Sequence, residues 1–384
     1  METFARTSAA DPAPYVPPPG PHWSRLRPEE AGMRPEPLAA AAAFALAHES
    51  TAWPREMVDA RGQYPHSGFT DRPEWDELIG PVKRPRGGPN GLVLRHGHIV
   101  AEWGDTARVD MTFSISKSYL ALAAGLACER GLIRSLHDPV RDYGLDEGFE
   151  APHNRPITWH HLLQQTSEWE GTLWGKPDLV DRNRAIGGDN AAKGQHRDLR
   201  APGTFWEYND VRVNRLALSL TLLFRRNLAD VLREAVLDPI GCAPDWSWPA
   251  YRNATVTLDG APVAVVPGGG HWGGGLWIAS RDHARMALLV LRGGVWGGRR
   301  VLPAGWVEAL ATPAPDNPGY GYLWWLNPGG RNLPGAPERS LLCRGAGTHL
   351  IWIDPEHDLV LVSRWVDRPH WDELCGLVLE SLGG

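Results

Sequence analysis

The segment "FSISKSYLALAAGLACERG" (113–131) constrains the fold more than any other part of the chain. After Ser114 it consists almost entirely of small and apolar residues, and a helix that is apolar all round has to be buried. It follows "NGLVLRHGHIVAEWGD" (90–105), which predicts two strands about a His96-Gly97 turn. A hairpin followed at once by a buried helix predicts a sheet covered by helices.

The bulk composition is that of an ordinary globular protein. With 384 residues, the chain can bury its own core without disulfide or metal support. Charged residues make up 22% and the formal net charge is only −6, so neither a nucleic-acid partner nor a membrane partner is indicated.

The cysteines and the amino terminus predict a cytoplasmic protein. Cys128, Cys242, Cys343 and Cys375 lie far apart and form no Cys-x-x-Cys pair, so we expect reduced thiols rather than a zinc or redox site. The amino terminus has no apolar stretch behind a basic start, unlike a secretory signal.

Changes in amino-acid composition and in predicted secondary structure divide the chain into three parts. Residues 1–22 read as a Pro-rich tail, and residues 136–255 as a helical subdomain with Gly-, Pro- and Asp-rich loops. Residues 23–135 and 256–384 would form one sheet subdomain. Its later strand-like runs are "GYGYLWWLN", "RSLLCRG", "THLIWIDP" and "DLVLVSRWVD", before a final helix in "PHWDELCGLVLESL". Their short connections predict mostly antiparallel strands.

Ser114 and Lys117 form a candidate nucleophile and base. Positions i and i+3 share one helix face, so the hydroxyl and the amine can reach hydrogen-bond distance. The helix start supplies unpaired N–H groups to a developing oxyanion, and burial favours a neutral amine that can take the serine proton. The chain has only four lysines. A simple helix start, with a capping serine and a solvated lysine, is the other interpretation, and these residues alone leave both open.

Five passages in order resemble one protein family. They are "FSISKSYLALAAG", "PITWHHLLQQTSEW", "APGTFWEYND", "HWGGGLWIASRDHARMALLVLRGG" and "CRGAGTHLIWIDPEHDLVLV". This set resembles the serine β-lactamase and penicillin-binding-protein superfamily, from about residue 25 to the end. The likeness is strongest to the branch with class C β-lactamases, family VIII carboxylesterases and 6-aminohexanoate-oligomer hydrolases. It implies an α/β (α+β) fold of the β-lactamase/transpeptidase type, with an antiparallel sheet flanked by helices, an inserted helical subdomain and an active site between them.

The resemblance assigns a catalytic tyrosine. Tyr208 in "WEYND" falls at the family's tyrosine, which shuttles the nucleophile's proton to the leaving group. The family's Tyr-x-Asn is altered here, because Asp210 takes the Asn position and Asn209 lies between. A carboxylate there would favour the charged form of Lys117 and move more of the base role to Tyr208.

The third motif of the family also departs from its usual form. The Lys-Thr-Gly of β-lactamases aligns with Cys343-Arg344-Gly345. By position, the backbone N–H of Ala346 would complete an oxyanion hole with that of Ser114, and a backbone donor survives side-chain changes. Arg344 could replace the family's cation if it points inward, although an arginine on a strand is more often solvated or paired structurally.

Three sequence features that could indicate a nucleotide loop, a metal site or an α/β-hydrolase triad are weaker signals than the five passages above. Gly268, Gly270 and Gly273 form Gly-x-Gly-x-x-Gly, but the next helix starts too late for a dinucleotide loop. His160-His161 lacks metal-ligand spacing, and no Gly-x-Ser-x-Gly elbow is present, so we expect neither a metal, nor a cofactor, nor an α/β-hydrolase triad.

Tryptophan is abundant, with 19 residues. Trp169 and Trp174 fall in the segment that borders the family's cleft, so an apolar or aromatic acyl group is a reasonable substrate expectation.

The sequence therefore predicts a serine hydrolase that works through an acyl-enzyme on a small molecule. Esters are the first expected substrates and small linear amides the second. A β-lactamase or D,D-peptidase is one alternative, against which the missing signal and the missing Lys-Thr-Gly speak. A non-catalytic ligand-binding protein on the same fold is the other. The oligomeric state is not predicted.

Overall fold

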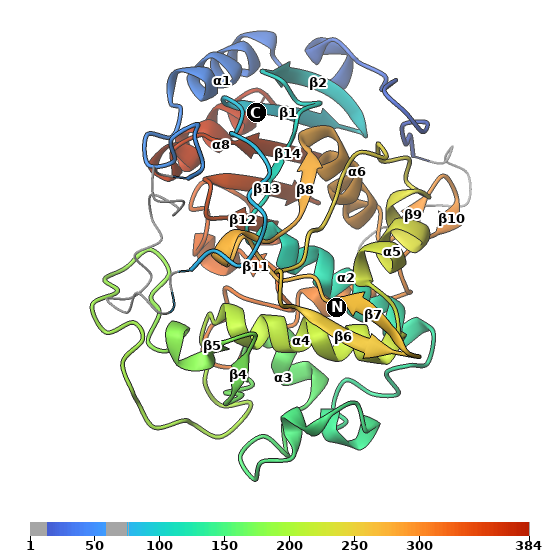
Figure 1. Cartoon of the computed structure of the whole chain (residues 1–384). Helices are drawn as coiled ribbons and strands as arrows, with labels where there is room; N and C mark the ends of the chain where they lie inside the picture. The colour runs from blue at the N-terminus through green and yellow to red at the C-terminus, as the bar shows by residue number, and fades with distance from the viewer. Residues whose placement is uncertain (1–13, 59–74, 76, 384) are drawn as a thin grey trace.

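The computed structural model describes residues 14–58, 75 and 77–383. Its main element is a six-stranded antiparallel sheet in the order β11-β12-β13-β14-β1-β2 (Figure 1). The strands are β1 (Asn90–Arg95), β2 (His98–Trp103), β11 (Trp325–Leu326), β12 (Leu341–Gly345), β13 (His349–Asp354) and β14 (Leu359–Arg364). Because β1 pairs with β14 along its whole length, the two ends of the chain share one sheet, as predicted.

Helices cover both faces of this sheet. Strand β14 shows why, because all its residues are buried and successive side chains point to opposite faces. Leu359 and Leu361 pack with α1 (Pro35–Ala47) and α8 (Trp371–Glu380), which lie together at the top of Figure 1. Val360 and Val362 join the core that contains α2 (Ile115–Glu129) and α6 (Ser280–Leu291).

The apolar helix predicted at the start is α2, and it is buried at every position from Ile115 to Ala127. It contacts the sheet at β12 on one side and α4 (Asp210–Phe224) on the other. Figure 1 shows α2 in the middle of the molecule, between the sheet and the helices below it. The first residue of α2 therefore lies where the two parts of the protein meet.

The stretch predicted to be helical contains three α-helices, four short 3-10 or π-helical turns and a small hairpin. The α-helices are α3 (Trp159–Gln164), α4 and α5 (Leu228–Leu232), and the hairpin strands are β4 (Thr172–Leu173) and β5 (Lys176–Pro177). Buried ion pairs hold this part together, since Glu168 accepts from Arg197 at 2.6 and 2.7 Å and also pairs with Arg212. The predicted boundaries at 136 and 255 stay predictions.

Shorter elements complete the fold. They are β3 (Val109–Met111), β6 (Thr255–Leu258), β7 (Ala261–Ala264), β8 (Trp277–Ala279), β9 (Val295–Trp296), β10 (Arg299–Arg300) and α7 (Trp306–Leu310). The strand expected in "GYGYLWWLN" is reduced to β11, because Leu323 has a φ of +58° and the backbone turns there. A left-handed residue cannot continue an extended strand.

Part of the predicted tail is packed on the molecule. Residues 1–13 lie outside the described residues. Beyond them, the Tyr15 ring stacks on His98 with centroids 3.9 Å apart, and Arg285 donates to the carbonyls of Pro18 and Gly20 at 2.9 and 2.8 Å.

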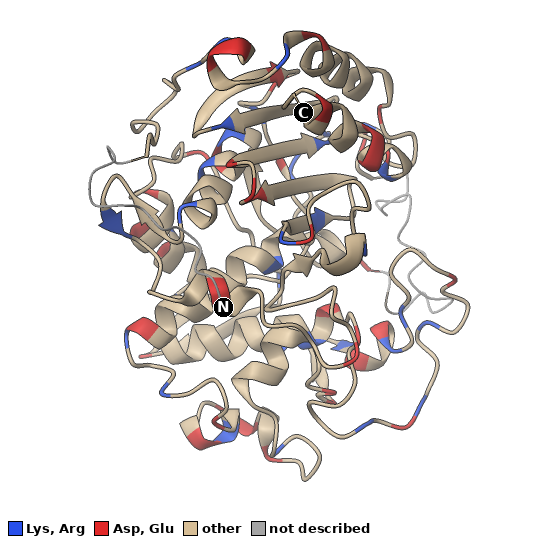
Figure 2. Cartoon of the chain, turned by 180° about the vertical axis from the view of Figure 1, so that it is seen from behind, with Lys and Arg blue, Asp and Glu red and all other residues tan. Residues whose placement is uncertain are grey.

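Seen from behind in Figure 2, basic and acidic residues are interspersed over both parts of the chain. A search of the described helices finds none with the length and apolar character needed to cross a membrane.

Candidate active site

Ser114 and Lys117 are in direct contact at the start of α2. Ser114 is the residue before the helix, and Lys117 lies one turn later and is only 1% exposed. The Lys117 Nζ donates a hydrogen bond of 2.9 Å to the Ser114 Oγ. Phe113, just before the serine, has a φ of +51°, an uncommon conformation for a non-glycine residue that aims the chain sharply into the helix. The structure thus brings the predicted pair together.

The charge on Lys117 is fixed by Asp210. Burial disfavours the ammonium form, but the ion pair between Nζ and the Asp210 Oδ1 outweighs it, so the pKa of Lys117 lies above its ordinary value. The expectation of a neutral lysine is therefore wrong, because the burial that would neutralise the amine comes with a carboxylate. The charged lysine expected from Asp210 at the family's Asn position agrees with the structure.

Asp210 belongs to a buried network of alternating charges. Its Oδ2 accepts from Arg184 Nη1 and from His271 Nδ1, both at 2.6 Å, and its backbone N–H donates to Asp181 at 2.8 Å. Burial raises the pKa of Asp210, but Lys117 and Arg184 lower it more, so that it lies well below the usual range. Burial keeps the pKa of His271 below its ordinary value, although Asp181 and Asp210 act in the opposite direction.

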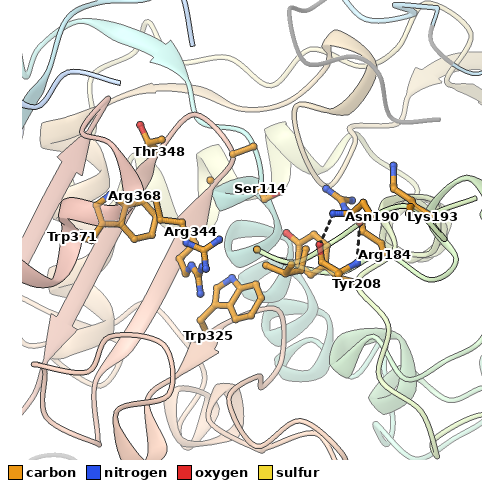
Figure 3. Close-up of a pocket in the computed structure, with 16 residues that line it drawn as sticks. Ser114, Arg184, Asn190, Lys193, Tyr208, Trp325, Arg344, Thr348, Arg368 and Trp371 are labelled. Carbon is orange, nitrogen blue, oxygen red and sulfur yellow. Dashed lines mark hydrogen bonds between the residues drawn. The ribbon is translucent and has the colours of Figure 1, made fainter. Parts of the chain in front are cut away.

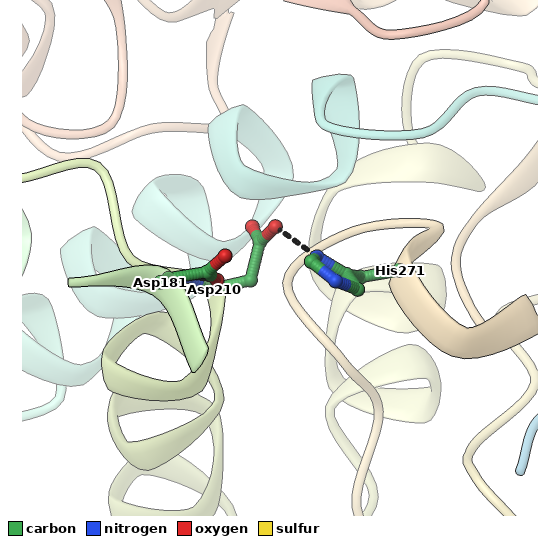
Figure 4. A group of neighbouring side chains, drawn as sticks. All are labelled: Asp181, Asp210 and His271. Carbon is green, nitrogen blue, oxygen red and sulfur yellow. Dashed lines mark hydrogen bonds and ion pairs between the residues drawn. The ribbon is translucent and has the colours of Figure 1, made fainter. Parts of the chain in front are cut away.

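Asp181, Asp210 and His271 offer three potential metal-ligand atoms within 4.8 Å of one another (Figure 4). Positive side chains already neutralise both carboxylates. Lys117 pairs with Asp210, Lys193 Nζ lies 3.1 Å from Asp181, and Arg184 contacts both. A metal ion would have to displace these cations, so we assign the cluster to the electrostatics around Lys117.

Tyr208 lies next to Lys117, just before α4. The Lys117 Nζ is 4.7 Å from the centroid of the Tyr208 ring and the Arg184 guanidinium carbon is 5.1 Å from it. The ring stacks on Trp325 with centroids 5.8 Å apart. Tyr208 is 4% exposed, and it lines the same pocket as Ser114. Both cations interact electrostatically with the Tyr208 side chain, so they would stabilise negative charge that develops on it.

The predicted oxyanion-hole residues Ser114 and Ala346 lie at the same pocket. Both residues line the pocket, and neither N–H donates to an acceptor within the described chain. Gly345 makes this approach possible, since a Cβ on it would lie 2.6 Å from the carbonyl oxygen of Thr112. The end of β12 can thus come close to the turn that carries Ser114.

Three residues that the sequence predicts at the site do not line the pocket at Ser114. Asn209 caps α4, because its Oδ1 accepts from the backbone N–H groups of Val211 and Arg212. Trp169 and Trp174 pack in the helical part, where the Trp169 indole donates to the Gly148 carbonyl and Trp174 meets the Tyr251 ring. Neither tryptophan lines the pocket at Ser114, whose aromatic wall comes from Trp325 and Trp371.

The pocket has a volume of about 500 Å³, enough for a small organic molecule (Figure 3). Arg344, Arg368 and Trp371 lie on one side of Ser114, and Tyr208, Arg184 and Lys193 on the other. Its lining residues are Ser114, Arg184, Ala185, Ile186, Gly187, Asn190, Ala191, Lys193, Tyr208, Trp325, Arg344, Gly345, Ala346, Thr348, Arg368 and Trp371.

Sequence reasoning missed Arg184 and the loop around His271. Arg184 lies in a polar stretch without periodicity, and nothing in the sequence indicates its contact with Asp210. The sequence suggests a nucleotide loop at Gly268, Gly270 and Gly273, and the passage that begins at His271 resembles the family's Gly-rich turn, but neither observation places His271 beside Asp210. In the structure the glycine run packs against the serine-lysine pair, and a Cβ on Gly269 would lie 3.1 Å from the Lys117 Nζ.

Known proteins resemble this chain in sequence and in fold. The family model described as "Beta-lactamase" matches residues 92–365. A 6-aminohexanoate-dimer hydrolase from Paenarthrobacter ureafaciens is 32% identical over 322 residues, which cover 75% of this chain and 76% of that protein.

Two solved structures show the same fold. EstCE1, described as a hydrolase with promiscuous acyltransferase activity, has a TM-score of 0.58 at 15% identity, covering 93% of this chain and 99% of its own. A β-lactamase from Mycobacterium bovis has a TM-score of 0.54 at 21% identity, covering 77% of this chain and 94% of its own.

Proposed function

The chain belongs to the beta-lactamase family, and from that membership and the site geometry we propose that it is a serine hydrolase that cleaves carboxylic esters or small linear amides. The observation that carries the proposal is the 2.9 Å hydrogen bond between the Lys117 Nζ and the Ser114 Oγ, in a pocket that Tyr208 also lines. A hydroxyl is a weak nucleophile, and it needs such neighbours to lose its proton during attack.

In the proposed reaction Tyr208 takes part as a phenolate: the Ser114 oxygen attacks the substrate carbonyl as its proton passes to the phenolate oxygen. The charged Lys117 holds the nucleophile in place and compensates negative charge on the serine and the phenol. The N–H groups of Ser114 and Ala346 hold the oxyanion of the tetrahedral intermediate. Tyr208 returns the proton to the leaving group, and water then releases the acid from the acyl-enzyme by the same route in reverse.

Esters are the first-choice substrates, because an ester leaving group needs less protonation than an amine. Linear amides come second. The similarity to a 6-aminohexanoate-dimer hydrolase favours them, since an amide bond joins the two units of such a dimer. Cys343-Arg344-Gly345 in place of Lys-Thr-Gly makes a β-lactamase the third choice.

Labelling with a fluorophosphonate tests the serine mechanism directly. We expect one adduct, found on Ser114 by mass spectrometry of the digested protein, together with turnover of p-nitrophenyl butyrate. An unlabelled Ser114 would instead support a non-catalytic binding protein. Nitrocefin turnover comparable with that of the ester would place β-lactams first.

Replacing Asp210 with asparagine should move the pH profile to lower pH. The wild-type activity is expected to rise towards alkaline pH and to fall once the Lys117 ammonium loses its charge. Loss of the carboxylate lowers the pKa of Lys117, because Asp210 is what holds it up. The falling limb of kcat/KM should therefore move to lower pH, by about one pH unit or more.

The matched control for this profile is Asp181→Asn. Asp181 is also buried, but it pairs with Arg184 and Lys193 rather than with Lys117, so a smaller displacement is expected. If the inflection of kcat/KM stays at the same pH in Asp210→Asn, the electrostatic coupling of Asp210 to Lys117 is contradicted.

We also propose that the protein acts in the cytoplasm. All four cysteines are free thiols, two of them fully buried, as is usual in a reducing compartment.

A further inference from the structure

A buried histidine on α6 connects the two sides of the turn that carries Ser114. His283 is 0% exposed and does not line the pocket, so a substrate at Ser114 does not touch it. Its Nε2 lies 2.6 Å from the Thr112 Oγ1, two residues before the nucleophile. Its Nδ1 lies 2.9 Å from the Tyr119 hydroxyl, which belongs to α2. A side chain from another element thus bridges the chain before and after Ser114.

The direction of these two hydrogen bonds follows from a third contact of His283. The Arg364 Nη2 lies 3.3 Å from the same Nε2, and a guanidinium can only donate. The Nε2 therefore carries no proton, and it also accepts from the Thr112 hydroxyl. Burial and the charge of Arg364 hold the pKa of His283 well below its ordinary value. The neutral ring then carries its proton on Nδ1, which donates to Tyr119.

The turn that this histidine bridges has a strained backbone. Phe113 lies between Thr112 and Ser114 with a φ of +51°, a conformation that a non-glycine residue keeps only where its surroundings impose it. The Thr112 carbonyl oxygen also lies close to Gly345, where a Cβ would be 2.6 Å from it. A shift of Thr112 would therefore move Ser114 relative to Ala346, which follows Gly345 in the pocket wall.

Stability alone does not explain a polar network at this place in the core. Thr112, Tyr119 and His283 are all 0% exposed, and the hydrogen bonds of buried polar groups do little more than offset their lost hydration. Apolar side chains of the same shape would fill this space about as well. A buried network with all its members bonded provides one fixed geometry instead.

We propose that His283 is a positioning residue for the nucleophile. Its hydrogen bonds to Thr112 and Tyr119 fix the turn between them, and with the turn the Ser114 Oγ. The inference rests on the proposed hydrolase function and adds to it a residue that lies outside the pocket. A displacement of about 1 Å can cost about 100-fold in rate, so loss of the network lowers kcat while substrate binding is nearly unchanged.

Replacing His283 with leucine removes both hydrogen bonds and keeps most of the side-chain volume. With p-nitrophenyl butyrate we expect kcat to fall about 10- to 100-fold and KM to stay within about threefold of the wild-type value. The rate of fluorophosphonate labelling of Ser114 should fall by a similar factor, because that reaction depends on the same nucleophile.

A triple variant separates positioning from stability. Thr112→Val, Tyr119→Phe and His283→Leu together replace the whole network with apolar groups, whereas His283→Leu alone leaves two buried hydroxyls without their partner. The triple variant should therefore unfold at a higher temperature than His283→Leu. Its kcat should stay as low, because the turn still lacks its fixed geometry. A purely structural role predicts instead that kcat recovers together with stability.

Ser280→Ala is the matched control. Ser280 also lies on α6 and is 0% exposed, and its hydroxyl donates to the Asn90 Oδ1 at 2.6 Å, which joins α6 to β1 rather than to the turn at Ser114. This variant loses a buried hydrogen bond of the same helix, so it should lose stability and keep its kcat.

The outcomes separate this inference from the hydrolase function. A kcat within about threefold of the wild type in His283→Leu, a loss confined to KM, or a kcat that recovers in the triple variant would overturn the positioning role and leave the hydrolase intact. If His283→Leu does not fold, Thr112→Val and Tyr119→Phe take its place, and each should lower kcat by about threefold or more at unchanged KM. Failure of the hydrolase itself is a different result, namely no ester turnover and no label on Ser114 in the wild-type protein.

Discussion

Replacing Ser114 with alanine is expected to lower kcat for p-nitrophenyl butyrate by about 10⁴-fold or more, because it removes the proposed nucleophile. The hydroxyl oxygen is the only heavy atom removed, and its hydrogen-bond partner among the described residues, the Lys117 ammonium, keeps its ion pair with Asp210. The fold should therefore be unaffected. Stopped-flow or steady-state release of p-nitrophenol measures the loss, and the same variant should no longer take a fluorophosphonate label.

Ser118→Ala is the matched control for Ser114. Ser118 is a buried serine on the same helix, and its hydroxyl donates to the Leu323 carbonyl at 3.2 Å, away from the Lys117 amine. We expect Ser118→Ala to change stability more than kcat. If Ser114→Ala keeps more than a tenth of the wild-type activity, the nucleophile is another residue and the proposed mechanism is wrong.

Replacing Lys117 with methionine is expected to lower kcat/KM by about 10³-fold, the range of a removed acid-base or charge-stabilising group. Methionine fills a similar volume, so the loss reflects the missing ammonium rather than a cavity. Asp210 keeps Arg184 and His271 as partners in this variant, so the carboxylate is not left unpaired. The pH dependence should also flatten, because the charge that Asp210 opposes is gone.

Lys176→Met provides the comparison for the loss of a buried lysine. Lys176 is buried in the helical part, where its Nζ donates to the Trp75 carbonyl at 2.8 Å, and it does not line the pocket. Thermal unfolding of both variants separates stability from catalysis. An activity of Lys117→Met within tenfold of the wild type would exclude the amine from the reaction.

The elements that the sequence predicts best are those with a strong local pattern. Helix α2, the β1-β2 hairpin, the strands β12 to β14 and the last helix all follow from runs whose apolar residues leave one conformation that can bury them. The aromatic run that ends in β11 shows the limit, because the left-handed turn at Leu323 depends on contacts elsewhere in the fold. Its composition alone favours a strand.

The candidate site divides in the same way. Contact between Ser114 and Lys117 was predictable, because three residues along one helix fix the separation of two side chains. The protonation state of Lys117 was not predictable. Desolvation and the Asp210 charge act on its pKa in opposite directions, and only the distance between the two side chains in the folded protein decides which effect is larger. Trp169 and Trp174 were expected near the cleft from their place in the chain, but Trp325 and Trp371 line it.

The sequence by itself determined the fold family, the helix that carries the serine and the lysine, and the tyrosine that precedes α4. These depend on local spacing and on an ordered set of motifs. Only the tertiary structure decided which charges meet, because Arg184, His271, Arg344 and Arg368 come from four separate segments, and no local pattern encodes the distances between them. Electrostatic interaction depends on distance through space and on burial, and neither is written in the spacing of residues along the chain.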